Sequence, residues 1–202
     1  MNIADLSIAI NNLSTQRTAF WSEADFQFSL AWALQRLLPQ SKIYLERRAL
    51  IGGKACYIDI WVEDNGYIYP IELKYKTKRD KIGVVELKNQ SAVDFGCYDY
   101  LYDVHRLEQL KQQKMYNLDK GWAVMLTNEP LYYNNTNRPS AYDNFKIYQG
   151  AVRGGFLSWG MTSKGIPFNY DKRYNFSIVG TYTMNWGTYN NQGFRYLISE
   201  IA

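Results

Sequence analysis

The feature of this sequence that most constrains its fold is a pair of alternating segments joined by a tight turn. Residues 54–64, KACYIDIWVED, and residues 67–76, YIYPIELKYK, alternate in side-chain character and are separated only by Asn65 and Gly66. Alternation of this kind is typical of β-strands, and an Asn-Gly pair favours the turn that joins antiparallel neighbours. The sequence therefore predicts a β-hairpin over residues 54–76.

Helices and further strands are expected on both sides of this hairpin. Residues 22–38 carry apolar side chains at helical spacing, with Ser22 as the N-cap, Asp25 in the position of a capping box and Pro39 after the last turn. A second helix is expected over about residues 98–115. Further strands are expected at residues 42–51, 121–128, 145–149, 155–159, 175–186 and 194–201.

This order of elements predicts a single domain of the α/β class. Its core is expected over about residues 20–128 and a mainly β-stranded extension over about residues 145–202, whereas residues 1–18 are polar and show no clear pattern. The chain has 202 residues and is 47% hydrophobic, which suits one domain with a sizeable core.

Composition excludes some classes of protein and leaves others open. No apolar run is long enough to span a membrane, and the first residues lack the basic and apolar regions of a signal peptide. The two cysteines, Cys56 and Cys97, lack metal-ligand spacing and are too few for a disulfide framework, which favours a reducing, cytoplasmic compartment. A net charge of +4 is compatible with a polyanionic partner without implying one.

Charged side chains interrupt the predicted hairpin at two points. Asp59 breaks the apolar stretch of the first strand, and Glu72 and Lys74 share one face of the second. Antiparallel pairing can bring the carboxylates of Asp59 and Glu72 together, where they repel each other unless a cation lies between them. Oxygen ligands favour Mg²⁺ or Mn²⁺, and a neighbouring lysine can orient water or stabilise negative charge. This set of groups suits hydrolysis of a phosphodiester.

In their strand–turn–strand context, Asp59 and the Ile-Glu72-Leu-Lys74 segment resemble the signature of the PD-(D/E)XK nuclease superfamily. That superfamily includes type II restriction endonucleases, RecB-like nucleases and Holliday junction resolvases. Ile58 stands where its name has proline. The resemblance implies a restriction-endonuclease-like fold, a mixed central β-sheet flanked by helices. It also implies cleavage of DNA with Mg²⁺, or Mn²⁺ as a substitute, in which Asp59 and Glu72 bind the metal and Lys74 acts on the attacking water.

The resemblance implies roles for two further residues. Glu23, in the first turn of the helix that precedes the hairpin, matches a glutamate that often joins the metal site. Gln90, after the Lys74 strand, matches a polar active-site residue of some members. Each also has a structural interpretation, since Glu23 suits a helix N-terminus and a glutamine is commonly a surface residue. Glu72 and Lys74 likewise fit an exposed ion pair at a sheet edge.

The only histidine, His105, is expected on a helix beside Asp103 and Arg106, with no nucleophile elbow in the chain. Asp103 and Arg106 can pair across one helical turn. We interpret this group as a charged helix face or a structural network rather than as a hydrolase site.

A basic run follows the Lys74 strand and contains Lys76, Lys78, Arg79 and Lys81. Such a run either forms a solvated surface or contacts phosphates near the scissile bond. DNA is the expected partner, with a homodimer as an option. Two alternatives stay open, namely a non-catalytic binding module on the same fold and a nuclease for RNA or branched DNA.

Overall fold

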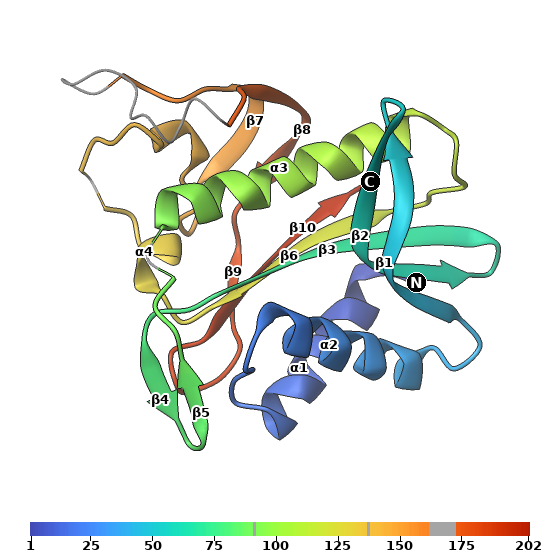
Figure 1. Cartoon of the computed structure of the whole chain (residues 1–202), viewed down its shortest axis with the longest axis horizontal. Coiled ribbons are helices and arrows are strands. Elements are labelled where there is room, and N and C mark those ends of the chain that lie inside the picture. Colours follow the sequence, from blue (N-terminus) through green and yellow to red (C-terminus); the bar gives the residue numbers. More distant parts are fainter. Residues whose placement is uncertain (91, 137, 162–172) are drawn as a thin grey trace.

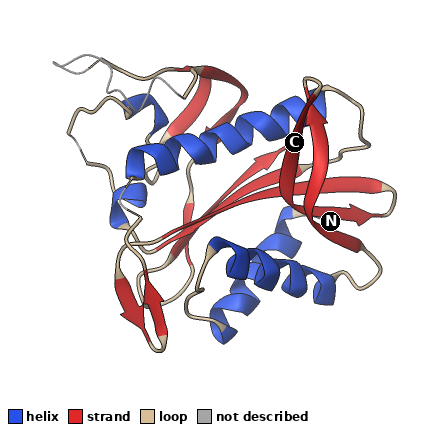
Figure 2. Ribbon diagram, viewed as in Figure 1, coloured by secondary structure: helices blue, strands red, loops and turns tan. Residues whose placement is uncertain are grey.

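A computed structural model describes residues 1–90, 92–136, 138–161 and 173–202 of the chain. The molecule has three layers, with a central β-sheet between two groups of helices (Figures 1 and 2). Helices α1 and α2 cover one face of the sheet, and the long helix α3 covers the other face. The α/β class predicted from the sequence is confirmed.

The helices are α1 (Ile3–Gln16), α2 (Glu23–Leu37), α3 (Val93–Gln112) and the single turn α4 (Pro130–Tyr133), followed by a 3₁₀ turn, η1 (Asp143–Phe145). The strands are β1 (Lys42–Ile51), β2 (Lys54–Asp64), β3 (Tyr67–Lys76), β4 (Asp80–Ile82), β5 (Val85–Leu87), β6 (Gly121–Thr127), β7 (Val152–Leu157), β8 (Phe176–Thr183), β9 (Trp186–Thr188) and β10 (Arg195–Ile201). Among the described residues, the central sheet has the order β1-β2-β3-β6-β10-β9. It is mixed, because β3 and β6 run parallel and the other neighbours run antiparallel.

Helix α2 begins where its capping residue predicts. The Ser22 side chain accepts a hydrogen bond from the Asp25 amide at 3.1 Å, which satisfies one free donor of the first turn. The predicted capping box is incomplete, because the Asp25 carboxylate instead accepts from the Trp21 amide at 2.9 Å and from Arg17 at 2.6 Å. Asp25 therefore connects the first turn of α2 to Arg17 and Trp21, which precede the helix.

The β2–β3 hairpin has the predicted position and turn. Asn65 and Gly66 both have positive φ values, 50° and 80°, as a turn of this type requires. The ladder between the strands runs back only to the pair Ile60–Ile71. Beyond that pair β2 continues with β1 alone, and the two strands curl away across one end of α3 (Figure 1). In the part of the chain that the structure describes, one edge of β3 thus has no strand partner beyond Ile71.

Helix α3 begins at Val93 rather than at the expected Tyr98. The added turn contains Gly96, which weakens the local helix signal. Tyr132 of α4 explains this glycine, because its hydroxyl occupies the space that a Cβ of residue 96 would need. Packing between α3 and α4 therefore overrides local propensity.

The polar N-terminal segment also forms a helix, α1, which the sequence pattern does not show. Asn2 and Asp5 form a capping box at its start, and Leu6 and Ile10 are buried against the core. This core lies between the α1–α2 pair and the sheet. The amphipathic face of α1 is therefore short but completely covered.

The C-terminal third differs from expectation in two ways. Residues 145–149 are not a strand; Phe145 and Ile147 are buried there, and the Ile147 carbonyl accepts from the Trp186 indole at 2.6 Å. The predicted run 175–186 divides into β8, which pairs with β7, and the start of β9, which pairs with β10. Because β9 and β10 belong to the central sheet, the expected extension is partly a component of the core.

Neither cysteine forms a disulfide, since Cys56 and Cys97 are both free thiols. Within the described ranges, no helix has the length and apolar character needed to cross a membrane.

Candidate functional site

Glu72 and Lys74 lie on the face of β3 that is covered by α3. The Lys74 ammonium is 2.5 Å from Asp103 Oδ2, and Glu72 Oε1 is 3.1 Å from a guanidinium nitrogen of Arg106. Asp103 and Arg106 also pair with each other at 3.3 Å, as their spacing predicts. The shared face of Glu72 and Lys74 is confirmed, but in the described part of the chain their ion pairs are with α3 and not with each other.

The free edge of β3 is occupied by side chains in place of a strand. Amides of alternate residues along a strand point toward the same edge. Three side-chain oxygens accept from three such amides: Asp59 Oδ2 from Leu73 (2.5 Å), Glu23 Oε2 from Tyr75 (2.7 Å) and Gln90 Oε1 from Thr77 (3.0 Å). These acceptors come from β2, from the first residue of α2 and from the segment before α3.

The five residues predicted for the active site therefore gather along residues 72–77, the end of β3 and the residue that follows it. Two of them belong to the strand, and the other three bond to its edge. Glu23 is directed at β3 as well as at the start of its own helix. Gln90 is exposed, although both its side chain and its amide bond to Thr77. Their metal-binding and catalytic roles remain predictions.

Burial dominates the electrostatics of the two hairpin carboxylates. Glu72 is only 2% exposed, and its burial and the nearby Asp103 raise its pKa well above the ordinary value, against the opposing charge of Arg106. Burial also raises the pKa of Asp59 to about 6, although Lys74 and the Leu73 amide oppose this shift. The negative charge of Asp59 also raises the pKa of Glu72, and those of Asp103 and Glu23 raise the pKa of Asp59.

The raised pKa of Lys74 favours its charged form, whereas the raised pKa values of Asp59 and Glu72 favour their neutral forms. Burial alone would lower its pKa, but the negative charges of Asp103, Glu23 and Asp59 outweigh burial and raise the pKa above its ordinary value. Its ammonium also donates to the Leu73 carbonyl at 3.0 Å. Lys74 is therefore protonated at neutral pH, and it can stabilise negative charge or donate to a water, but it cannot serve as a general base.

The donor chemistry of this cluster fits a hard divalent cation. Glu72 Oε1 is buried without a hydrogen-bond partner among the described residues, so its contact with Arg106 is ionic and poorly aligned. The mutual repulsion of Asp59 and Glu72 is the kind that a cation between carboxylates relieves. In the described ranges no three acidic, histidine or cysteine side chains converge as ligands. Cation binding thus requires Glu72 to turn away from Arg106.

Sequence reasoning assigned Asp103 and Arg106 to a charged helix face or a structural network, and the structure supports the network. Asp103 is 3% exposed and contacts Lys74, and Arg106 also donates to the Tyr57 carbonyl at 3.0 Å. The sequence contained an indication that Asp103 is buried, because Asp103 lies on the apolar stripe of its helix between Tyr100 and Leu107. A carboxylate on a buried stripe needs a cationic partner, and Lys74 is that partner.

The contacts of His105 are with β8 and with a tyrosine of its own helix. Its Nδ1 lies 2.7 Å from the Ser177 carbonyl, and its ring packs against Phe176 and Tyr102. These contacts join α3 to β8, so the structural interpretation of His105 holds.

The basic run leaves the end of β3 and enters a small hairpin, β4–β5, that the sequence did not predict. Lys76 is half-buried, whereas Lys78, Arg79 and Lys81 are exposed. Lys81 pairs with Glu86 across the hairpin at 3.4 Å. An exposed pair of this kind contributes little to stability.

No protein-family model matches the chain. No curated protein is significantly similar to it. Among solved structures, the chain is similar to the crystal structure of SSO0001, with 22% sequence identity and a TM-score of 0.21. The alignment covers 50% of this chain and 44% of that protein, so the chain spans less than half of its length. A TM-score this low supports no statement about fold or function.

Proposed function

We propose that this chain is a Mg²⁺-dependent nuclease of the PD-(D/E)XK type that hydrolyses DNA phosphodiester bonds on a restriction-endonuclease-like sheet. The observation that carries the proposal is the point where β2 leaves β3. There two carboxylates, the buried Glu72 and the half-buried Asp59, lie beside a protonated lysine, Lys74, on a strand edge that no other strand covers among the described residues.

Asp59 and Glu72 would hold the cation, with Glu23 as a further oxygen donor from the start of α2. A Mg²⁺ ion bound there would supply Lewis acidity toward a phosphoryl oxygen and lower the pKa of a bound water. The chain's own residues set up this site. The Leu73 and Tyr75 amides fix the carboxylates of Asp59 and Glu23 against β3.

Lys74 would stabilise the charge that develops on the phosphate and orient the attacking water. Asp103 makes this possible, because it holds the ammonium charged and in place under α3. Preorganised positive charge aimed at a developing anion is among the largest contributions to catalysis. Arg106 and Asp103 would then act as positioning residues for the strand-borne pair.

A second candidate function is a non-catalytic binding module on the same fold. It is favoured by the ion pairs themselves, since Glu72 pairs with Arg106 and Lys74 with Asp103 without any cation. On this interpretation the cluster only fastens α3 to the sheet. The module would need no metal, and it would keep its binding when Glu72 or Lys74 is replaced.

Metal-dependent cutting is the direct test. Supercoiled plasmid, linear duplex and single-stranded DNA are each incubated with the protein in Mg²⁺, Mn²⁺ or EDTA. We expect cleavage of at least one substrate with either metal, none in EDTA, and none by Glu72→Gln, because an amide cannot replace an anionic ligand. Strand scission is followed on gels.

The matched control is Glu63→Gln, a glutamate of the same hairpin whose carboxylate accepts from the Trp61 indole at 3.3 Å. It should cut as the original protein does. A folded protein that cuts none of the three substrates with either metal would contradict the nuclease proposal and favour the binding module.

The basic run gives a separate expectation about salt. If Lys76, Lys78 and Arg79 contact backbone phosphates, replacing all three with glutamine should flatten the plot of log affinity against log salt by about 0.9 per lost duplex contact. Affinity for a duplex is measured in EDTA over a range of salt concentrations. The exposed Lys42, at the start of β1, is the control position. An unchanged slope would assign the run to a solvated surface.

A further inference from the structure

Trp21 is exposed to solvent, and hydrogen bonds hold the backbone at Trp21 and at the preceding residue. Its side chain is 60% exposed, whereas the preceding Phe20 is completely buried. The Phe20 amide donates to the Tyr75 hydroxyl at 3.1 Å, and that hydroxyl donates to the Phe20 carbonyl at 3.0 Å. The Trp21 amide donates to Asp25 at 2.9 Å. The backbone that carries the exposed indole is therefore held at a defined place near β3.

An open groove of about 930 Å³ lies between Trp21 and the β4–β5 hairpin. This volume falls within the range of small-ligand sites, about 300–1,000 Å³. Val84, at the turn of the hairpin, is 81% exposed. The hairpin is itself anchored, because its other three apolar side chains are buried in the core that also contains residues of α1 and α2. These are Ile82, Val85 and Leu87. Both walls of the groove are thus built on fixed structure.

The charges of the groove favour an anionic occupant. Three cations, Arg79, Lys81 and Lys88, line it together with two acids, Asp80 and Glu86. Lys81 and Glu86 pair with each other at 3.4 Å. Among the described residues Arg79 and Lys88 have no ion-pair partner, so their charges are available to a ligand. An exposed indole that lines a groove together with free cations suits a nucleotide, which carries both an aromatic face and a phosphate.

The groove is continuous with the candidate site. Trp21 lies two residues before Glu23, whose carboxylate bonds to the Tyr75 amide. On the other wall, Asn89 lines the groove and directly precedes Gln90, which bonds to Thr77. The row of side chains along the edge of β3 therefore leads from Lys74 into the groove.

We propose that this groove is a nucleotide subsite in which the Trp21 ring stacks on an unpaired base while Arg79 and Lys88 contact the adjoining phosphates. Bases of an intact duplex do not expose their faces to a flat side chain, so the preferred substrate has single-stranded character next to the cut. The inference rests on the proposed nuclease function and narrows its substrate class to single strands and tailed or frayed duplexes.

Binding in EDTA tests this subsite without any cleavage. Fluorescence anisotropy measures the affinity of the full chain for a labelled oligothymidylate of about 12 nucleotides, a length within the range of single-strand site sizes. We expect Trp21→Ala to weaken this affinity about 5- to 100-fold, and Trp21→Phe to retain most of it. A blunt duplex of the same length should bind more weakly and should not respond to Trp21→Ala.

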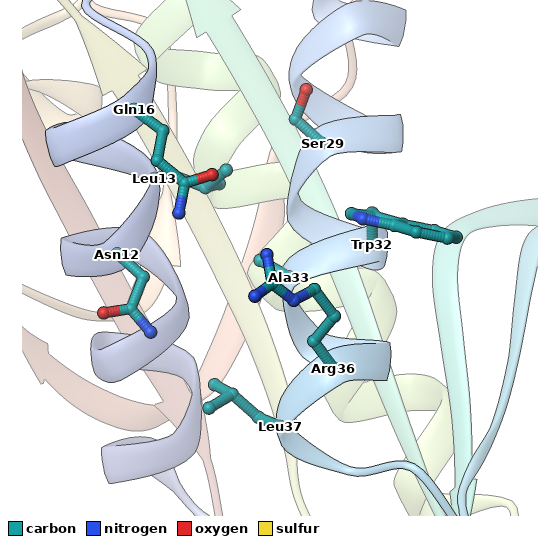
Figure 3. A pocket seen from close by; sticks show the side chains of 8 residues that line it. All are labelled: Asn12, Leu13, Gln16, Ser29, Trp32, Ala33, Arg36 and Leu37. Atoms are coloured by element: carbon teal, nitrogen blue, oxygen red, sulfur yellow. The ribbon is translucent and has the colours of Figure 1, made fainter.

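Trp32 supplies the matched control. Its side chain is 61% exposed and lies on α2, in a separate pocket of about 170 Å³ between α1 and α2, with Asn12 and Arg36 (Figure 3). Trp32→Ala should leave the affinity unchanged. The subsite is overturned if Trp21→Ala binds as tightly as the original protein, or if both tryptophan variants lose affinity equally.

The same data separate the two proposals. A protein that binds the oligonucleotide through Trp21 and cuts no DNA with either metal contradicts the nuclease function alone. Metal-dependent cutting that is insensitive to Trp21→Ala on every substrate overturns the subsite alone.

Discussion

Replacing Lys74 with methionine is expected to lower the rate of Mg²⁺-dependent DNA cleavage about 100- to 1,000-fold, because a preorganised charge next to the phosphate is lost. The change should also destabilise the fold by about 3 kcal/mol, since it leaves Asp103 buried with only part of its positive charge compensated. Arg106 still pairs with Asp103 at 3.3 Å, which keeps the loss near this lower limit.

A double variant separates catalysis from stability. Lys74→Met combined with Asp103→Asn removes both charges of the pair, so urea unfolding should show most of the stability restored. Cleavage should stay lost, because the ammonium is still absent. Recovery of cleavage by the double variant would show that Lys74 matters only through the fold.

Lys120→Met is the matched control for the lysine. Lys120 pairs with Glu200 at 2.7 Å at the far end of β6, and its side chain is 35% exposed. A pair at the surface contributes little, so urea unfolding should show almost no change in stability, and cleavage should not change.

The hairpin was predictable from the sequence because its determinants are local. The Asn65-Gly66 turn fixes which residues face each other, and the register places Asp59 opposite Glu72 one step beyond the Ile60–Ile71 pair. What the sequence could not indicate is that the ladder stops at that step. The carboxylate of Asp59 then accepts from the Leu73 amide, which would otherwise donate to a neighbouring strand.

The remaining parts depended on contacts between distant segments. Glu108 shows this for α3, because its carboxylate accepts from the amides of Val179 and Gly180 at 2.8 and 2.7 Å. No local pattern reports such a partner some seventy positions away. The insertion of β10 beside β6 is likewise set by tertiary pairing, which periodicity does not encode. The ion pair between Lys74 of β3 and Asp103 of α3 likewise depends on tertiary packing.

Replacing Asp59 with asparagine is expected to stabilise the metal-free protein at about pH 8 by about 2–3 kcal/mol. Burial raises the pKa of Asp59 from 3.8 to about 6, so the folded state resists its ionisation. Below 3.8 the group is protonated in both states and has no effect. Between 3.8 and about 6 only the unfolded chain ionises, and stability falls; above about 6 the full loss is present.

Urea unfolding in EDTA at about pH 4 and about pH 8 measures this effect, and the advantage of Asp59→Asn should nearly vanish at the lower pH. Asparagine can still accept from the Leu73 amide, so the strand edge stays capped. Asp64→Asn, on the same strand, should have the opposite sign, because the Ser41 hydroxyl and the N-terminal amine lower the pKa of Asp64 and its charge stabilises the fold. If Asp59→Asn were instead the less stable protein at the higher pH, the carboxylate would be a structural anchor. A gain in stability together with loss of cleavage would mean that the fold retains an unfavourable charge at this position for the cation it binds.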